Sequence, residues 1–200
     1  TTIGAATVEV VNGNPSNAND IVVSANTWSH SVMAGGNIAP PDENTDNPLE
    51  TFTPGERAGN GMGGSVNIQE GSSNVKVDIK DGARFQTQHG TMLAYANNHR
   101  ESHVVQVSGG MARDIGVNGA VGINVLNDKV VTHVADGAII DAKGIDVSAS
   151  ITQPGIFNLS GGFAVGGAVG VGVGIGINNV NRHAEAILGY EGVDDQAAAG

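Results

Sequence analysis

The sequence predicts an all-β protein, built as a parallel β-helix or a similar solenoid. Two observations support this fold class. Bulky and small residues alternate with a period of two over long stretches, and whole segments recur at an offset of 52–55 residues. A helix would need bulky residues three and four positions apart, so we expect very little helix. Long antiparallel strands joined by hairpins are the alternative, because they would preserve the same alternation.

Residues 1–34 are expected to form N-terminal strands. Two strand-like runs, residues 6–11 and 21–25, flank the turn signal Asn12-Gly13-Asn14-Pro15. Residues 35–64 differ in character, since they hold Pro40, Pro41, Pro48 and Pro54 together with many Asn, Gly and acidic residues. We interpret residues 35–64 as an inserted loop, of a length that in compact domains is functional or disordered.

Residues 65–200 form a repetitive β region. Three segments recur in the same order: residues 75–83 at 130–138, residues 108–110 at 160–162, and residues 123–127 at 177–181. Ordered recurrence indicates an internal repeat, which is typical of stacked β architectures. We expect the Asp-Gly-Ala and Ser-Gly-Gly segments of these repeats to mark corners between strands.

The strongest alternation lies in residues 163–177. Odd positions are mostly Val, Ile or Phe, and even positions are all Gly or Ala. Alternate side chains of a strand point to opposite faces, so we expect the Val and Ile face to be buried in a core. The nearly bare face suits close approach by another backbone, such as a neighbouring sheet. Residues 147–181 contain no Asp, Glu, Lys or Arg, and so have little protection against edge pairing.

Composition excludes several function classes. A net charge of −11 with only 14% charged residues argues against nucleic acid and anionic membranes as partners. The absence of cysteine rules out disulfides and thiolate metal sites, and suits a repetitive protein that crosses an oxidising compartment. Residues 161–177 are too rich in glycine for a transmembrane helix, so no stable membrane span is expected. From its first and last residues we interpret the chain as part of a longer protein.

The Asp-Gly-Ala corners, the run 167–178 and the Asn-rich strand exits resemble the repeats of very large secreted bacterial exoproteins. These are filamentous-haemagglutinin-like and leukotoxin-like filamentous adhesins, and the similarity covers roughly residues 75–188. The resemblance implies a right-handed parallel β-helix, export through the outer membrane, and a role in attachment or biofilm cohesion. It brings no catalytic residues. Residues 35–64 depart from the pattern.

Two groups of residues are candidate metal ligands. His99 and His103 lie four apart, but the Glu that follows the first His of a zincin motif is missing, and on a strand the two would lie about 13 Å apart. Asp42, Glu43 and Asp46 offer oxygen ligands of the kind that calcium takes, yet their spacing matches no calcium loop and solvated loop charges are the simpler explanation. We therefore expect no metal site.

Other candidate chemistry is equally weak. Adjacent strand residues such as Ser29, His30 and Ser31 point to opposite faces, so they form no catalytic pair. Gly109-Gly110 and the glycine run from Gly161 lack the Lys-Ser/Thr of a phosphate-binding loop. Trp28 and Tyr95 are isolated aromatics. The arginines are scattered and form no basic patch: Arg57, Arg84, Arg100, Arg113 and Arg182. No catalytic or cofactor-binding residues and no cofactor are predicted.

The sequence thus favours an extracellular structural or adhesive protein and not an enzyme. It would be a stalk segment of an adhesin or a subunit that stacks into a surface filament, with self-association or neighbouring repeats as partners and a cell-surface receptor or polysaccharide as ligand. A polysaccharide-acting β-helix enzyme is one alternative, although Asp136, Asp141 and Asp146 resemble corner and edge residues. A pore-forming or outer-membrane β protein is the other, although one Trp and two Tyr make a poor aromatic rim.

Overall fold

The computed structural model describes residues 2–3, 7–10, 19–38, 60–112 and 114–189. Within these residues the regular structure consists of β-strands, and no helix is present, as the alternation predicts. The strands are β1 (Thr2–Ile3), β2 (Thr7–Val10), β3 (Ile21–Ile38), β4 (Asn60–Ile79), β5 (Arg84–Thr87), β6 (Thr91–Ala112), β7 (Ile115–Val134), β8 (Ile139–Asp141), β9 (Gly144–Gly166) and β10 (Val169–Leu188).

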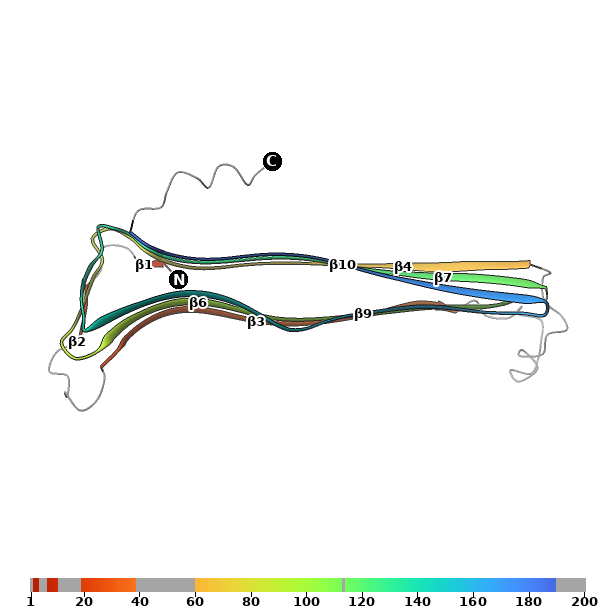
Figure 1. Ribbon diagram of the computed structural model, residues 1–200, viewed down its shortest axis with the longest axis horizontal. Coiled ribbons are helices and arrows are strands. Elements are labelled where there is room, and N and C mark those ends of the chain that lie inside the picture. The colour runs from red at the N-terminus through yellow and green to blue at the C-terminus, as the bar shows by residue number, and fades with distance from the viewer. Residues whose placement is uncertain (1, 4–6, 11–18, 39–59, 113, 190–200) are drawn as a thin grey trace.

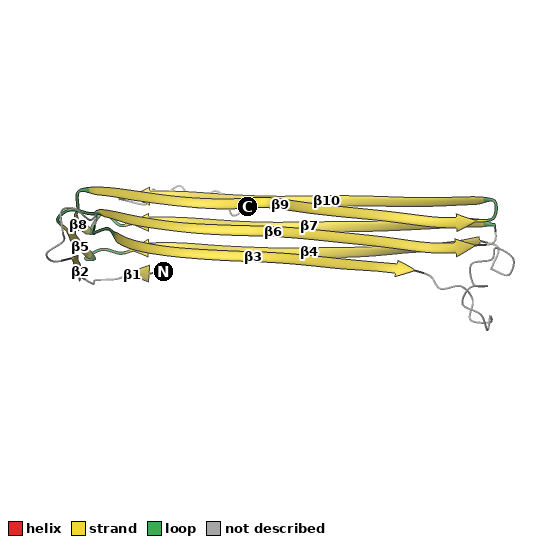
Figure 2. Ribbon diagram, turned by 90° about the horizontal axis from the view of Figure 1, so that it is seen from below, coloured by secondary structure: helices red, strands yellow, loops and turns green. Residues whose placement is uncertain are grey.

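The strands form three parallel sheets that the chain visits in turn. One long sheet has the order β1-β4-β7-β10, the second long sheet has the order β3-β6-β9, and a short sheet has the order β2-β5-β8. Figure 2 shows the successive circuits as rows, β3 with β4, then β6 with β7, then β9 with β10. All strand pairs between described residues are parallel, so the antiparallel alternative is wrong, although its long strands are present.

The register places most of the predicted repeat partners side by side. Val75 is paired with Val130, and Ile123 with Ile177, as the sequence matches require. The third match is displaced, because Ser108 is paired with Gly162 and not with Ser160. A bulge in β9, where Gln153 and Pro154 face a single residue of β6, changes the register offset from 53 to 54 residues and so accounts for one of the two residues of displacement. Proline lacks the N–H group of a regular ladder and is tolerated at such a bulge.

The N-terminal expectations meet the structure in part. The two predicted strands correspond to β2 and to the beginning of β3. Strand β3 continues to Ile38 and β4 begins at Asn60, so both ends of the expected loop 35–64 belong to strands. Residues 39–59 lie outside the described residues, and so do Asp42, Glu43 and Asp46.

An apolar core fills the end of the molecule at which the short sheet lies. There the two long sheets diverge and the short strands span the gap between them, as Figure 1 shows on the left. The buried side chains include Val77, Ile79, Phe85, Met92 and Val134. Burying a side chain of this size contributes about 1.5–3 kcal/mol, so this apolar core supplies most of the hydrophobic stabilisation.

The Asp-Gly-Ala segments mark corners at this end, as predicted. Residues 81–82 and 136–137 are turns, and Gly82 has a φ of 76°, a conformation that favours glycine. The corners continue the pairing between circuits, since Gly82 N donates to Gly137 O at 3.0 Å and Gly137 N donates to Asp81 Oδ1 at 3.2 Å. The Ser-Gly-Gly segments are not corners, because they lie inside β6 and β9.

In the opposite half of the long sheets the expectation that the Val and Ile face is buried is wrong. In β7 the buried positions are Gly116, Asn118, Ala120 and Gly122, whereas the intervening Val and Ile side chains point outward and are partly exposed. The reason is the distance between the sheets. A Cβ atom on Gly162 would lie 2.5 Å from Val173 O and 2.6 Å from Asn118 O, so only the smallest residues fit inside. The predicted close approach of a second backbone is therefore present.

An ion-pair cluster lies on the outer face of the first long sheet near the apolar end. Asp78 accepts from Lys80 Nζ at 2.7 Å and from Lys76 Nζ at 3.2 Å, and His133 Nδ1 lies 3.0 Å from its other oxygen. Burial by itself raises the pKa of the Asp78 carboxyl, but the hydrogen bonds from Lys80, His133 and Lys76 outweigh it and hold this pKa well below its ordinary range.

We expect acid to weaken the fold through Asp78. A carboxyl with a depressed folded-state pKa contributes stability above its unfolded-state pKa of about 3.9, and this contribution is lost as the pH falls towards the folded-state value. Asp78→Asn should lower the free energy of unfolding at pH 7 and flatten its decline below about pH 5. Denaturant unfolding between pH 7 and pH 2.5 measures both, with Asp146→Asn at an exposed carboxylate as control. Parallel curves for Asp78→Asn and the wild type would contradict the assignment.

Two adjacent glycines of β9 provide a matched test of the close sheet contact. Gly162→Ala places a methyl group against two carbonyl oxygens and should lower the free energy of unfolding by about 1–3 kcal/mol. Gly161→Ala places a methyl group where no atom lies within 4 Å, and should be neutral or stabilising by up to about 1 kcal/mol. Thermal and denaturant unfolding compare the two variants. Equal destabilisation would show that strand propensity, and not sheet spacing, selects glycine.

Candidate functional site

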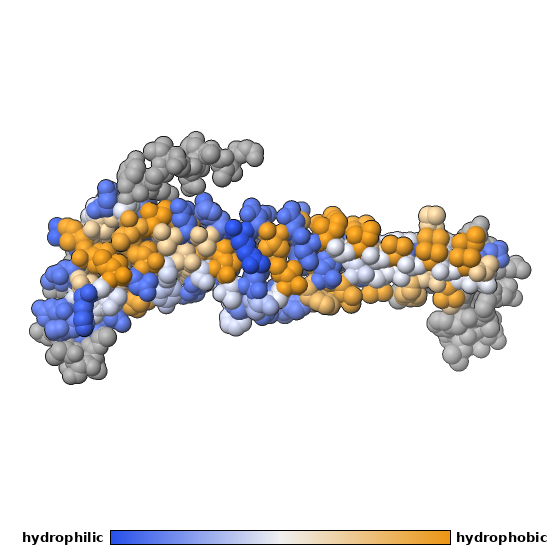
Figure 3. Space-filling view, viewed as in Figure 1, coloured by the Kyte–Doolittle hydropathy of each residue, from blue (hydrophilic) through white to orange (hydrophobic). Residues whose placement is uncertain are grey.

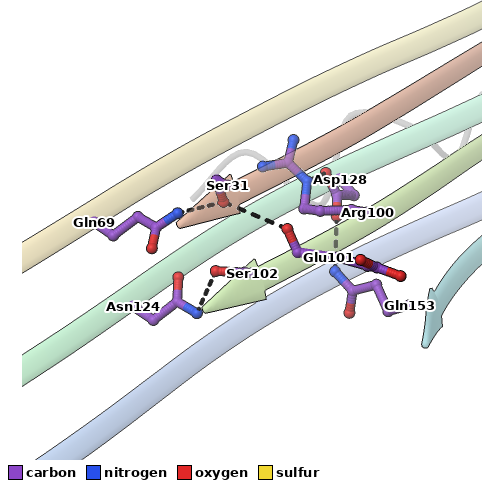
Figure 4. A network of polar contacts seen from close by, with 8 residues as sticks. All are labelled: Ser31, Gln69, Arg100, Glu101, Ser102, Asn124, Asp128 and Gln153. Atoms are coloured by element: carbon purple, nitrogen blue, oxygen red, sulfur yellow. Dashed lines mark hydrogen bonds and ion pairs between the residues drawn. The ribbon is translucent and has the colours of Figure 1, made fainter. Parts of the chain in front are cut away.

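A band of polar side chains lies between the two long sheets, midway between the apolar core and the glycine-rich half. Figure 4 shows that its members project from both sheets toward one another. Gln69 of β4 donates to Ser31 Oγ of β3, and Asn124 of β7 donates to Ser102 Oγ of β6 at 2.9 Å. Gln69, Asn124 and Asn178 are register partners, so each circuit contributes one amide to the same row.

The band also holds a buried ion pair. Arg100 Nε of β6 lies 3.0 Å from Asp128 Oδ1 of β7, and their side chains are 8% and 0% exposed. Gln153 of the third circuit donates to the other Asp128 oxygen at 3.0 Å. Gly71 makes room for the guanidinium group, since a Cβ atom there would lie 2.2 Å from Arg100 Nη1. The ion pair connects the two long sheets, because Arg100 belongs to β6 and Asp128 to β7.

The residues weighed as catalytic or metal ligands are distributed over both faces of the second long sheet. Ser31 points inward to Gln69, whereas His30 points outward to Glu101, as expected for strand neighbours. His99 and His103 are both on the outer face of β6. The sequence pattern does not predict that His30 lies near these two histidines. His30 lies near them because β3 and β6 are parallel and their register pairs His30 with Glu101.

The isolated aromatics do not form a platform. Trp28 is 75% exposed and its ring lies 4.6 Å from that of His99, whereas Tyr95 is partly buried on β6. Gly109 lies under the ring of Phe163 on the outer face, and Gly110 faces Asn118 inside. Both glycines are residues of strand β6.

The acidic residues of the enzyme alternative do not converge. Asp136 is in a corner, Asp141 ends β8 and Asp146 is an exposed residue of β9. The described part of the chain has hollows that are open to solvent. One of about 290 Å³ is lined mainly by apolar residues around Val134 and Leu188, and one of about 410 Å³ is lined by Ser, Asn, Asp, Lys and His side chains around Asn127.

The outer faces of the glycine-rich half are apolar on both long sheets. Across β4, β7 and β10 the outward residues form rows such as Val66, Val121 and Ile175, or Ile68, Ile123 and Ile177. The outward side chains of the third circuit are 42–50% exposed: Phe157, Leu159, Phe163, Val165, Val169, Val171, Val173, Ile175 and Ile177. Figure 3 shows apolar rows along both outer sides of this narrow end, with residues of intermediate hydropathy between them.

Among the described residues, two long strands end the stack without a strand partner on their outer side. Strand β10 is the last strand of the first long sheet and β9 is the last strand of the second. The charge-free residues 147–181 cover nearly all of β9 and the first half of β10. We call the free sides of these two strands the open edge. Natural proteins protect such edges with charges, prolines or bulges. Within residues 147–181 the bulge at Pro154 is such a device, and charged side chains occur on the two edge strands only outside that range, at Asp146, Arg182 and Glu185.

Comparison with protein-family models, with curated proteins and with solved structures yields no significant match. The function of the chain must therefore be argued from its own geometry. None of the described residues belongs to a helix that is long and apolar enough to cross a membrane.

The buried ion pair allows a test of the polar band. Asp128→Asn leaves the buried Arg100 charge without its counter-ion and should lower the free energy of unfolding by about 3–5 kcal/mol. The double variant Arg100→Met with Asp128→Leu removes both charges and should be much less destabilised, because well-packed apolar replacements of buried pairs are often neutral. Equilibrium unfolding of the wild type, single and double variants measures this. A double variant that is less stable than the single variant would contradict this account.

Proposed function

We propose that this chain is a segment of an extracellular, right-handed parallel β-solenoid with a structural or adhesive function. In this proposal the open edge pairs with further circuits, which belong either to neighbouring repeats of a longer chain or to another copy. The protein then extends as a rod or filament on the cell surface, and a receptor or polysaccharide binds along it.

One observation carries the proposal. Among the described residues, β9 presents 23 and β10 presents 20 consecutive residue positions without a strand partner on the outer side, at the same end of the stack, and residues 147–181 carry no charged side chain. Unpaired backbone donors and acceptors are a template for strand addition, in which the main chain supplies the affinity.

The inward-facing rows support extension in the same direction. The amides of Gln69, Asn124 and Asn178 repeat from circuit to circuit, and Asn158 donates to Gly122 O at 2.9 Å and to Ile177 O at 3.1 Å across the sheets. A further circuit with the same pattern would continue these contacts. Extended stacks of strands are stabilised by such amide ladders.

The apolar outer rows and the family resemblance favour a scaffold over an enzyme. The rows run along the stacking direction, so adding circuits lengthens a continuous apolar strip that suits lateral contact with another surface. The resemblance to filamentous adhesin repeats implies secretion and a place at the cell surface, in keeping with a chain that has no cysteine.

Charges at the open edge should suppress assembly. The double variant Leu159→Lys with Ile175→Lys puts one lysine on the outward face of each edge strand, where each side chain is about half exposed. Charged edge residues are the devices by which natural sheets avoid pairing, so we expect the wild type to form rods in a concentration-dependent way and this variant to remain largely monomeric. Sedimentation velocity and negative-stain electron microscopy provide the measurements.

The matched control carries the same charges away from the edge. Val105→Lys and Val121→Lys are outward positions on β6 and β7 and are the register partners of Leu159 and Ile175. This variant changes the net charge equally but leaves the edge strands intact, so it should still assemble. A wild type that stays a compact monomer at every concentration would overturn the proposal, and so would equal loss of assembly in both variants.

A further inference from the structure

A histidine and carboxylate cluster lies on the outer face of the second long sheet. His30 comes from β3, and Glu101 and His103 come from β6. One ligand atom of each residue, two imidazole nitrogens and a carboxylate oxygen, lies within 4.8 Å of the other two. These side chains point away from the core, and the ring of His103 lies 6.2 Å from that of Phe157 of β9 on the same outer face.

Glu101 lies between the histidines of the cluster. His30 Nε2 lies 3.8 Å from Glu101 Oε2, too far for a hydrogen bond, and the rings of His30 and His103 are 5.5 Å apart. His99 Nε2 lies 3.8 Å from the other Glu101 oxygen and has no hydrogen-bond partner among the described residues. Imidazole and carboxylate groups are thus gathered around one space without being satisfied by one another.

The site is preformed by strand pairing and open on one side. The register places His30 beside Glu101, and Glu101 beside Gly155 of β9. Gly155 has no atom within 4 Å of the position that a Cβ would take, so no side chain of the third circuit fills the space next to Glu101. The side chain of His30 is half exposed and that of Glu101 is one-third exposed, so both have room to rotate toward one another on the outer face.

The donor set indicates the class of ligand. Two imidazole nitrogens and one carboxylate oxygen are characteristic of first-row divalent transition ions such as Zn²⁺, whereas Ca²⁺ and Mg²⁺ prefer oxygen alone. Ligand atoms around tetrahedral Zn²⁺ are roughly 3.3 Å apart, so a small rotation of each side chain closes the present spacing.

We propose that His30, Glu101 and His103 bind a divalent transition-metal ion, with Zn²⁺ as the ion to test, and that the open side leaves a coordination position for water or for a donor atom of another molecule. The ion connects β3 to β6, and therefore holds the first circuit to the second. This proposal does not depend on the proposed scaffold function.

The test uses the whole chain, freed of metal with EDTA and dialysed. Calorimetric titration of the chain with ZnCl₂ should give a binding stoichiometry of one ion per chain. At a free Zn²⁺ concentration of one hundred times Kd the melting temperature should rise by about 5–10 °C, and EDTA should reverse the rise. Co²⁺ in place of Zn²⁺ should give visible absorption bands of a nitrogen and oxygen site, whereas CaCl₂ should change neither signal.

Single substitutions locate the ion. His30→Ala, Glu101→Gln and His103→Ala should each remove the stoichiometric binding and the Co²⁺ bands, while circular dichroism without metal remains that of the wild type, because these are outer-face residues. His183→Ala is the matched control. His183 Nε2 lies 3.1 Å from Glu185 Oε2 on β10, and no third His, Asp or Glu of the described residues joins this pair as a ligand, so this variant should bind as the wild type does.

Two results would overturn the proposal. One is the absence of Zn²⁺ binding to the wild type at concentrations up to a millimolar. The other is binding that persists in His30→Ala and His103→Ala but is lost in His183→Ala, which would place the ion elsewhere.

Discussion

The two long sheets come so close together over half of their length that backbone meets backbone. A Cβ atom on Gly172 would lie 2.0 Å from Gly162 O, and one on Gly174 would lie 2.0 Å from Ser160 O. Interiors are packed to crystal-like density, so a methyl group at such a position must displace a whole strand. This spacing decides which residues can lie inside, and every other feature of the narrow half follows from it.

Because the inside is occupied by glycine, alanine, serine and asparagine, the aliphatic side chains have only the outer faces left. They gain partial burial from their neighbours along the rows of the parallel sheets, where in-register strands place Val beside Val and Ile beside Ile. The hydrophobic stabilisation is therefore concentrated at the opposite end, where the short sheet separates the long ones and Phe85, Ile79 and Met92 are fully enclosed. The two long sheets are therefore far apart at the apolar end and close together at the glycine-lined end (Figure 1).

The polar band lies between the apolar core and the glycine-rich half. At intermediate sheet spacing, side chains such as Gln69, Asn124 and Arg100 are long enough to reach across but too polar to be left unpaired. The band fixes the register of each strand within its own sheet, since a slip by one residue against the neighbouring strand would turn its inward amide to the outer face. A fold specified in this way is well suited to repetition, and it leaves the outer faces free for contacts such as the His30, Glu101 and His103 cluster.

The sequence alone determined the strand content, the repeat and the Asp-Gly-Ala corners, because alternation and recurrence are local properties of the chain. It also indicated correctly that the glycine face approaches another backbone. It could not determine which face is inside. In β9 the bulky residues occupy odd positions except at Ile156, yet Val147 and Ile151 face the core side whereas Phe157 and Leu159 face outward, because the bulge at Gln153 and Pro154 reverses the parity. The histidine cluster was equally hidden, since His30 reaches Glu101 and His103 only through the pairing of β3 with β6 across the intervening segment. Sheet spacing and inter-circuit register are properties of the assembled sheets, and only the tertiary structure decided them.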